Sequence, residues 1–224
     1  QISISSEVCA EIREFERFTT TAINAYIKPL MSRYLKSLET NLKRSGFNSS
    51  FLLMTSGGSL TNVKNASDFP VRLVESGPAG GVILANSVAR ELNLDQVISF
   101  DMGGTTAKIT IIQNKNPNKA REFEVDRKSR FQKGSGLPVR IPVIEMVEIG
   151  AGGGSIARIN KLDQITIGPD SAGSSPGPAC YGLGGKNPTI TDADLIVGKL
   201  NPKNFAAGKI ELFPENSKNV INNN

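Results

Sequence analysis

The 224-residue sequence contains no histidine. This absence excludes His-ligated metal sites, Ser-His-Asp triads and imidazole general bases within the chain. Any acid–base step that the chain carries must therefore use an Asp, Glu, Lys, Tyr or Cys side chain, or a residue of a partner.

Cysteines and long apolar runs are also scarce. The two cysteines, Cys9 and Cys180, lie too far apart to suggest a disulfide framework, so we expect reduced thiols of the kind that the cytosol maintains. Neither has an adjacent basic residue to activate a thiolate, so we expect both to be small buried hydrophobes. No apolar run approaches the roughly 20 residues that span a bilayer, and no signal peptide opens the sequence. These features predict a cytoplasmic protein with no membrane partner.

The net charge of +5 is modest. Basic residues gather only at 115–140, and aromatic residues do not interleave with them. Nucleic-acid-binding surfaces usually show a dense basic face, so we expect a solvated basic loop and no nucleic-acid partner.

The most informative stretch is residues 97–112, VISFDMGGTTAKITII, where two apolar runs flank a polar turn. The runs predict two strands. The turn offers free N–H groups, close backbone approach and two hydroxyls to a phosphate, from Gly103, Gly104, Thr105 and Thr106. Asp101 would repel a bare phosphate unless a cation lies between them, so the pattern favours a Mg²⁺-nucleotide. The alternative is a plain hairpin turn.

A second glycine-rich segment precedes this turn. Residues 71–76 predict a short strand, and residues 78–92 predict a helix that opens on small residues, with Gly77 and Gly80 at its start. Such a start exposes free N–H groups and the positive end of the helix dipole to an anion. Glu75 lies directly before it. We expect the helix start and the turn to share a phosphate pocket, although such glycines can also reflect tight packing.

Regular elements are predicted on either side of these motifs. Apolar residues at three- and four-residue steps predict a helix over 14–45, which Pro29 kinks or splits and Gly46 ends. Its predicted apolar face consists of Ile23, Tyr26, Ile27, Leu30, Tyr34, Leu38 and Leu42. A buried strand at 51–54, the helix at 78–92 and the strand at 97–101 alternate as in an α/β layer.

The later part of the chain is rich in glycine. In residues 148–159, four glycines that include Gly152 and Gly153 fit either a phosphate cradle or a tight chain crossing. Residues 168–185 predict an ordered loop or a lid. Near 189–194, we expect Thr191 or Asp192 to cap a short helix, and this is favoured over a metal site at Asp192 or Asp194. The polar tail from 215 is expected to fray.

Six blocks of the sequence resemble the hydantoinase A / 5-oxoprolinase family, which includes N-methylhydantoinases and subunits of acetone- and acetophenone-type carboxylases. The blocks appear in the family's order and occupy residues 5–35, 69–82, 99–109, 145–159, 168–185 and 188–202. The order of the glycine motifs also resembles the superfamily of acetate and sugar kinases, heat-shock chaperones and actin. The resemblance implies an actin-like ATPase α/β fold with ATP and Mg²⁺ as cofactors.

The resemblance also implies a reaction and roles for residues. It implies ATP-dependent opening of a cyclic amide of the hydantoin or 5-oxoproline type, with a hydantoinase-B-like partner. Asp101 would orient Mg²⁺, Glu75 would order a water, and phosphates would be held by Gly103, Gly104, Thr105, Thr106, Gly77 and Gly80. For Gly152 and Gly153, the resemblance makes contact with a ligand as well supported as a tight chain crossing. An ATP-dependent carboxylase subunit and a non-catalytic nucleotide sensor are the alternatives.

The sequence departs from the family pattern at two places. An early Asp-x-Gly-Gly-Thr phosphate motif and a late adenosine motif are both missing. We therefore expect a central piece of a longer polypeptide that carries half a nucleotide cleft and is inactive alone. The expected parts are a helical lead-in at 1–50, the ATPase domain at 51–214 and a frayed tail at 215–224.

Overall fold

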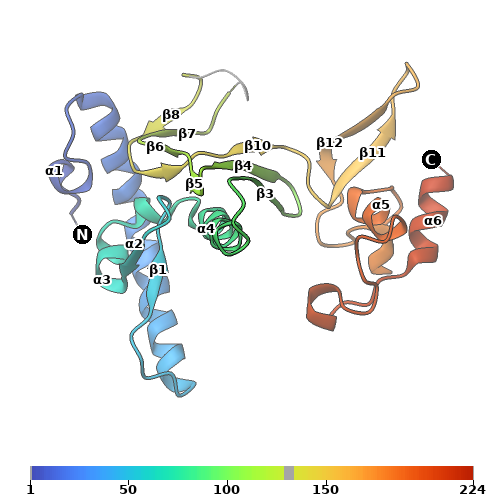
Figure 1. Cartoon of the computed structure of the whole chain (residues 1–224), viewed down its shortest axis with the longest axis horizontal. Coiled ribbons are helices and arrows are strands. Elements are labelled where there is room, and N and C mark those ends of the chain that lie inside the picture. The colour runs from blue at the N-terminus through green and yellow to red at the C-terminus, as the bar shows by residue number, and fades with distance from the viewer. Residues whose placement is uncertain (1, 129–133, 224) are drawn as a thin grey trace. The chain divides into compact units, whose positions relative to one another are not determined.

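The computed structural model of the protein describes residues 2–128 and 134–223. The chain divides into two compact units. The first comprises Gln1–Ser99 with Thr110–Met146, and the second comprises Phe100–Ile109 with Val147–Asn224. Figure 1 labels their elements. The expected boundaries at residues 50 and 214 concern the domains of a whole protein and stay a prediction.

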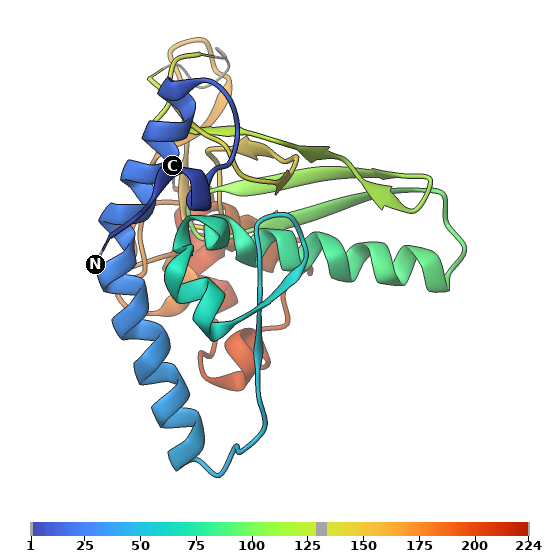
Figure 2. The ribbon, with the colours of Figure 1, turned by 90° about the vertical axis from the view of Figure 1, so that its left-hand side faces the viewer.

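The helical segments of the first unit are α1 (Ser5–Val8), α2 (Glu14–Arg44), α3 (Val63–Asp68), η1 (Pro70–Leu73) and α4 (Ser76–Glu91). The long helix α2 confirms the helix predicted over 14–45 (Figure 2). Pro29 lies inside it and does not split it. Contacts of α2 with α3, η1 and β8 (Leu137–Val139) support the helix despite the missing proline N–H. Gly46 follows the helix with φ 87°, as predicted for a C-terminal glycine.

The predicted apolar face of α2 is wrong in part. Tyr26 is 87% exposed, and Leu30 and Tyr34 are exposed as well. Asn24 is fully buried instead, because its amide donates to the Asp68 carbonyl at 3.1 Å and accepts the Val71 N–H at 3.2 Å. The face of α2 that packs is therefore chosen partly by polar contacts with η1 and the residues before it.

The strands are β1 (Leu52–Met54), β2 (Leu60–Asn62), β3 (Gln96–Met102), β4 (Ala107–Gln113), β5 (Asn116–Pro117), β6 (Lys119–Ala120), β7 (Phe123–Val125), β8, β9 (Val143–Ile144), β10 (Val147–Ile149), β11 (Ser155–Ile159) and β12 (Ile165–Ser171). One sheet has the order β10-β4-β3, with β5 paired to β4. The strands predicted at 51–54 and 97–101 are present as β1 and β3. The expected burial of the first is wrong, since Leu52 is exposed and Leu53 and Met54 are only half-buried. The pairs β1–β2, β6–β9 and β7–β8 form separate antiparallel ribbons.

The strand predicted at 71–76 is wrong, since η1 occupies the first half of this segment and α4 begins at its last residue. Pro70 begins the 3₁₀ turn, where its fixed φ and missing N–H are tolerated. The side chain of Ser56 donates to the carbonyls of Arg72, at 2.7 Å, and of Val74, so these groups need no strand partner.

Two apolar clusters stabilise the first unit. One joins Val8, Val71, Val139, Ile141 and Val143, with Ile23 and Ile27 of α2 against it. The other joins Ala79 and Val82 of α4 to Ile112 and Ile144, so α4 packs along β3 and β4 (Figure 2). The helix predicted at 78–92 is confirmed as α4. Leu84, Val88 and Leu92 are exposed, because only one narrow stripe of α4 meets the sheet.

The second unit contains the turn end of the β3–β4 hairpin, the antiparallel pair β11–β12, η2 (Ala179–Tyr181), α5 (Ile190–Ile196), η3 (Phe205–Gly208) and α6 (Pro214–Asn222). Cys180, Leu195 and Leu212 form its buried cluster. The expected loop at 168–185 begins inside β12 and then turns into η2.

The C-terminal residues do not form the expected frayed tail. They form α6, whose Ser217 is fully buried and donates to the Asp192 carboxylate at 2.7 Å. This buried hydrogen bond, together with one from the Asn216 side chain to the Ala179 carbonyl at 3.3 Å, holds a segment whose composition is polar. No helix in the described residues combines the length and the hydropathy that crossing a membrane requires.

Candidate functional site

The turn between β3 and β4 is tight and exposed. The Gly103 N–H donates to the Thr106 carbonyl at 2.9 Å and closes the turn. Asp101, Gly103, Gly104 and Thr105 are exposed, whereas the next residue inward, Ala107, is buried. The backbone and the Thr105 hydroxyl of the turn are therefore accessible to solvent, whereas β4 becomes buried at Ala107.

The backbone of the 148–159 loop supports this turn from one side. The Gly153 N–H donates to the Gly103 carbonyl at 2.9 Å, and the Gly154 N–H donates to the Gly104 carbonyl at 2.8 Å. Two consecutive carbonyls of the turn are thereby bonded to protein. The turn is held in place by main-chain hydrogen bonds that do not depend on side chains.

Only glycine fits at the contact between the two segments. A Cβ at position 152 would lie 2.5 Å from the Thr105 nitrogen and 2.7 Å from the Gly103 oxygen. A Cβ at position 154 would lie 3.0 Å from the Gly104 oxygen. These are backbone atoms that cannot move aside. The glycines of this loop thus allow two chain segments to touch, which is the tight-crossing alternative of the sequence interpretation.

Residues beyond the motifs complete this support. The Thr191 N–H and hydroxyl both donate to the Gly153 carbonyl, at 2.9 and 2.8 Å, and the Ala172 N–H donates to the Gly154 carbonyl at 2.8 Å. Ser155 is buried, and its hydroxyl accepts the Gly152 N–H at 2.9 Å. The N–H groups of Gly152 and Gly153 are consequently used within the protein. Sequence reasoning missed Thr191 and Ala172, because nothing in their local pattern indicates contact with a distant loop.

The other side of the turn is open to a ligand. In the described part of the chain, the N–H groups of Gly104 and Thr105 donate to no protein acceptor. A Cβ at position 104 would meet nothing within 4 Å, so no protein atom requires glycine there. Neither Gly103 nor Gly104 has a positive φ, so the backbone conformation does not require glycine at either position. Open amides beside unfilled space fit the oxygens of a phosphate group.

Asp101 can supply one carboxylate near this turn. Among the residues that the structure describes, no group of three or more His, Cys, Asp or Glu side chains could hold a metal ion. A Mg²⁺ at this position would therefore take most of its oxygen ligands from a nucleotide and from water, as Mg²⁺ commonly does beside phosphates. The donor set fits a bridged nucleotide and does not fit a metal site built from protein alone.

The start of α4, in the first unit, has separate anion-binding features. No side chain caps the helix, and Gly77 is exposed with open space where a Cβ would lie. A Cβ at Gly80 would be 3.9 Å from Met54 Cγ, an ordinary contact. Glu75 precedes the helix with φ 65° and ψ 17°, in the left-handed region. A non-glycine residue is disfavoured there by roughly 1–2 kcal/mol, and such strain is often found at functional positions.

The cysteines and the later acidic residues have structural roles. Burial, with the nearby Asp192 charge, raises the pKa of the Cys180 thiol to about 12, and burial also raises the pKa of Cys9. Asp192 is fully buried and accepts five hydrogen bonds, from the N–H groups of Ala179, Cys180 and Thr189 and the hydroxyls of Thr189 and Ser217. Asp194 pairs with Lys199 at 3.2 Å. The expected helix is present as α5, but its capping residue is Thr189 and not Thr191 or Asp192; the Asp192 side chain completes the capping box by accepting the Thr189 N–H.

The chain is thus an α/β protein with an exposed glycine turn, which the 148–159 loop holds on one side. The sequence model of the family described as "Hydantoinase/oxoprolinase" matches residues 17–223, so the chain belongs to that family. The predicted resemblance is confirmed.

Relatives agree with this assignment. The chain is 46% identical to an uncharacterized protein of Methanocaldococcus jannaschii, covering 97% of this chain and 32% of that protein. It is 35% identical to the caprolactamase subunit alpha of Pseudomonas jessenii, covering 92% of this chain and 28% of the subunit. The structure also matches nucleotide-free acetone carboxylase, described as acting in ATP-dependent acetone carboxylation, with TM-score 0.73, 27% identity and coverage of 98% and 29%.

These matches confirm the α/β ATPase-type fold class. The chain spans less than a third of the length of each of these relatives.

Proposed function

We propose that this chain is part of an enzyme that uses ATP to open a cyclic amide. The family includes oxoprolinases by its description, and one relative is named for the lactam that it acts on. The single observation that carries the proposal is the β3–β4 turn, whose Gly104 and Thr105 amides have no acceptor among the residues that the structure describes. In the proposed site, these amides and the Thr105 and Thr106 hydroxyls donate to phosphate oxygens of ATP.

Asp101 has the second role in this proposal. Its carboxylate orients Mg²⁺ through water, and the bound ion supplies charge neutralisation between the carboxylate and the phosphates. Gly103 closes the turn and keeps Asp101 and the amides in a fixed relation. In this interpretation Gly152 and Gly153 act indirectly, by holding the turn.

The start of α4 is proposed as a further anion-binding element. Its uncapped N–H groups, near Gly77 and Gly80, can donate to an oxyanion, and Glu75 is the candidate for ordering a water. That these residues share one pocket with Asp101 stays a prediction.

The proposed reaction explains why ATP is needed. A ring amide is a poor electrophile, since its nitrogen lone pair is delocalised onto the carbonyl. Transfer of the terminal phosphoryl group of ATP to the amide oxygen breaks the bond to ADP and forms an activated imidate phosphate. Water then adds to the activated carbon, and the adduct collapses by breaking the ring C–N bond, so that the protonated amine leaves and an acyl phosphate remains. A second water hydrolyses the acyl phosphate to the carboxylate and inorganic phosphate. The residues of this chain would bind the phosphates of ATP and stabilise their charge.

A carboxylase subunit is the second candidate. The match to acetone carboxylase favours it, because the two chains superpose over 98% of this one. In that branch, ATP would activate bicarbonate or an enolised ketone. Because relatives are named as subunits, we propose a hydantoinase-B-like partner in either case. A non-catalytic nucleotide sensor would bind ATP without turnover.

The test is ATP hydrolysis by the full-length protein together with its partner subunit. Phosphate release is measured with a hydantoin, 5-oxoproline or caprolactam, and separately with a ketone plus bicarbonate. Stimulation by a cyclic amide supports the proposal, and stimulation only by ketone and bicarbonate replaces it with the carboxylase function. ATP binding without any stimulation supports the sensor.

A matched pair of variants locates the site. Asp101→Asn should weaken Mg²⁺-dependent ATP binding, whereas Asp163→Asn, an exposed acidic residue in the β11–β12 turn, should not. Equal ATP affinity of the Asp101 variant and the parent, with and without Mg²⁺, would remove Asp101 from the site.

A further inference from the structure

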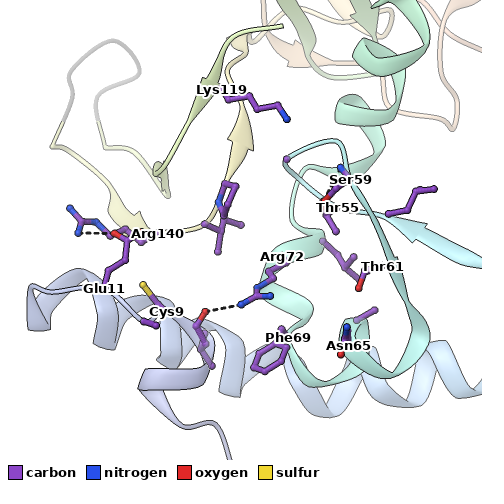
Figure 3. A pocket seen from close by; sticks show the side chains of 18 residues that line it. Cys9, Glu11, Thr55, Ser59, Thr61, Asn65, Phe69, Arg72, Lys119 and Arg140 are labelled. Atoms are coloured by element: carbon purple, nitrogen blue, oxygen red, sulfur yellow. Dashed lines mark hydrogen bonds and ion pairs between the residues drawn. The ribbon is translucent and has the colours of Figure 1, made fainter. Parts of the chain in front are cut away.

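A second candidate site lies wholly within the first unit. It is a pocket of about 610 Å³, bounded by the end of α1, the β1–β2 turn, α3, η1 and the segment around Arg140 (Figure 3). This volume falls within the range typical of small-molecule sites. The pocket shares no residue with the β3–β4 turn or with the start of α4.

Arg72 of η1 lines this pocket. Its guanidinium stacks on the Phe69 ring, 4.7 Å from the ring centroid, and one of its N–H groups donates to the Val8 carbonyl at 3.5 Å. Arg72 has no carboxylate partner in the described chain. The stacking orients the guanidinium, while most of its five N–H donors remain available.

Lys119 of β6 supplies a second cation. Figure 3 shows Lys119 extending from its strand toward the pocket, on the side opposite Phe69. It is exposed, and it too has no carboxylate partner among the described residues. Two cations of separate elements thus line one pocket.

The two other ionised groups of the lining, Arg140 and Glu11, offset each other, and Glu122, outside the lining, adds one negative charge beside Arg140. Arg140 bonds to Glu11 and to Glu122, each at 3.2 Å, and its side chain is 15% exposed. Glu11 is the one carboxylate among the pocket's lining residues, and it faces Arg140. The pocket therefore keeps the uncompensated positive charge of Arg72 and Lys119.

Neutral groups complete the lining. The Thr55 and Ser59 hydroxyls bond to each other at 2.8 Å, and the side chains of Thr61 and Asn65 form no hydrogen bond within the described chain. Apolar surface is contributed by Leu60, Phe69, Ile141 and Pro142. Two cations, available polar groups and an apolar wall match a small organic molecule that carries an oxyanion.

We propose that this pocket binds a small organic molecule with two anionic groups, one held by Arg72 and the other by Lys119 on the opposite side of the pocket. Arg72 provides directed N–H donors, and the flexible side chain of Lys119 provides an ammonium for the second group. Thr61 and Asn65 contact the polar part of the rest of the ligand. The proposal stands on unit-one residues alone and does not depend on the ATP-dependent function.

The test is calorimetric binding to the full-length protein with its partner, using glutarate, inorganic phosphate and neutral glutaramide. Glutarate or phosphate should bind at millimolar concentration, and glutaramide should not. Tighter binding of glutarate assigns a carboxylate ligand, and tighter binding of phosphate assigns a phosphorylated one.

Variants assign the binding to this pocket. Arg72→Met and Lys119→Met should each lower the affinity for glutarate by about tenfold or more, as expected for a lost charge-assisted hydrogen bond. Lys64→Met, an exposed lysine of α3 outside the lining, should leave the affinity unchanged. The melting temperature is measured for each variant, and the exposed Lys119 keeps the test valid if Arg72→Met fails to fold.

The proposal is overturned by any of three results. These are no binding of either anion, binding that is equal in the parent and the Lys119→Met variant, or binding of glutaramide as tight as that of glutarate.

Discussion

The backbone N–H of Gly153 donates a hydrogen bond of 2.9 Å to the carbonyl oxygen of Gly103, and so joins two glycine-rich segments from distant parts of the sequence. The contact lets no side chain intervene, since a Cβ at Gly152 would meet the Thr105 nitrogen at 2.5 Å. The two segments therefore have different roles. The segment with Gly152 and Gly153 holds the turn in place, and the turn with Gly103 and Gly104 carries the open amides.

This division predicts opposite effects for two glycine substitutions. Gly152→Ala should lower the free energy of unfolding by about 2 to 3 kcal/mol, because the new methyl group overlaps backbone atoms. Gly104→Ala should change stability by less than about 0.5 kcal/mol, because its Cβ has open space. It should still weaken ATP binding about tenfold, since the methyl group lies beside the proposed phosphate-binding amides.

Denaturant unfolding and ATP titration of both variants check this prediction. Gly77→Ala, where a Cβ also has open space, serves as a second control for folding. Unchanged ATP affinity of the Gly104 variant would contradict the proposed position of the phosphates, and full stability of the Gly152 variant would contradict the tight crossing.

Asp192→Asn should destabilise the second unit. Each carboxylate oxygen of Asp192 accepts backbone N–H groups, from Cys180 on one oxygen and from Ala179 and Thr189 on the other. Whichever way the new amide turns, its NH₂ group faces another N–H donor. The expected loss is about 3 kcal/mol, as for removal of hydrogen bonds to a buried charge.

Thermal unfolding measures this effect, and Asp194→Asn is the matched control. Asp194 lies on the same helix and pairs with Lys199 in an exposed ion pair, so its change should cost less than about 1 kcal/mol. Similar losses for the two variants would show that the five hydrogen bonds to Asp192 contribute little.

Local sequence patterns predicted the elements better than their contacts. Apolar runs located β3 and β4, and helical spacing located α2 and α4 to within a few residues. The spacing could not identify which face of α2 is buried, because Asn24 is selected by hydrogen bonds to Asp68 and Val71. Hydrophobic periodicity counts apolar residues only, so a buried amide escapes it.

The candidate site shows the same limit. The turn at Asp101–Thr106 could be found from the sequence, since strand, glycine and hydroxyl residues follow one another. That Gly152 and Gly153 hold this turn could not be found, because a glycine-rich loop gives the same pattern whether it contacts a ligand or another backbone segment. The two cases are distinguished only by the atoms that a Cβ at each glycine would meet in the folded protein.

The Cys180 thiol should be unreactive in the folded protein. Burial and the Asp192 charge raise its pKa from 9.0 to about 12, so thiolate is scarce at neutral and mildly alkaline pH. The folded state favours the neutral thiol, so the associated stability is full below pH 9.0 and is lost as pH rises toward about 12. Iodoacetamide labelling should proceed only on unfolding.

Mass spectrometry of the labelled protein at increasing pH checks this. Cys9 is also buried and its pKa is raised, so it provides an internal comparison in the first unit. Rapid labelling of Cys180 in the native protein near pH 8 would contradict the inert role and reopen it as a nucleophile.

Glu75→Gly should separate backbone strain from chemistry at the start of α4. Glu75 has φ 65°, which glycine adopts without the cost of roughly 1 kcal/mol that a side chain imposes. Glycine also raises the entropy of the unfolded chain by a similar amount, so the free energy of unfolding should stay within about 1 kcal/mol of the parent. If the carboxylate orders a water, ATP turnover should fall at least tenfold nonetheless.

Glu75→Gln completes this comparison, because it retains the side-chain length and the left-handed backbone while it removes the charge. Loss of turnover in both variants, with ATP affinity retained, assigns a role to the carboxylate itself. Loss in the glycine variant alone would assign the effect to backbone position. Full turnover in both would mean that the strain at Glu75 serves only to turn the chain from η1 into α4.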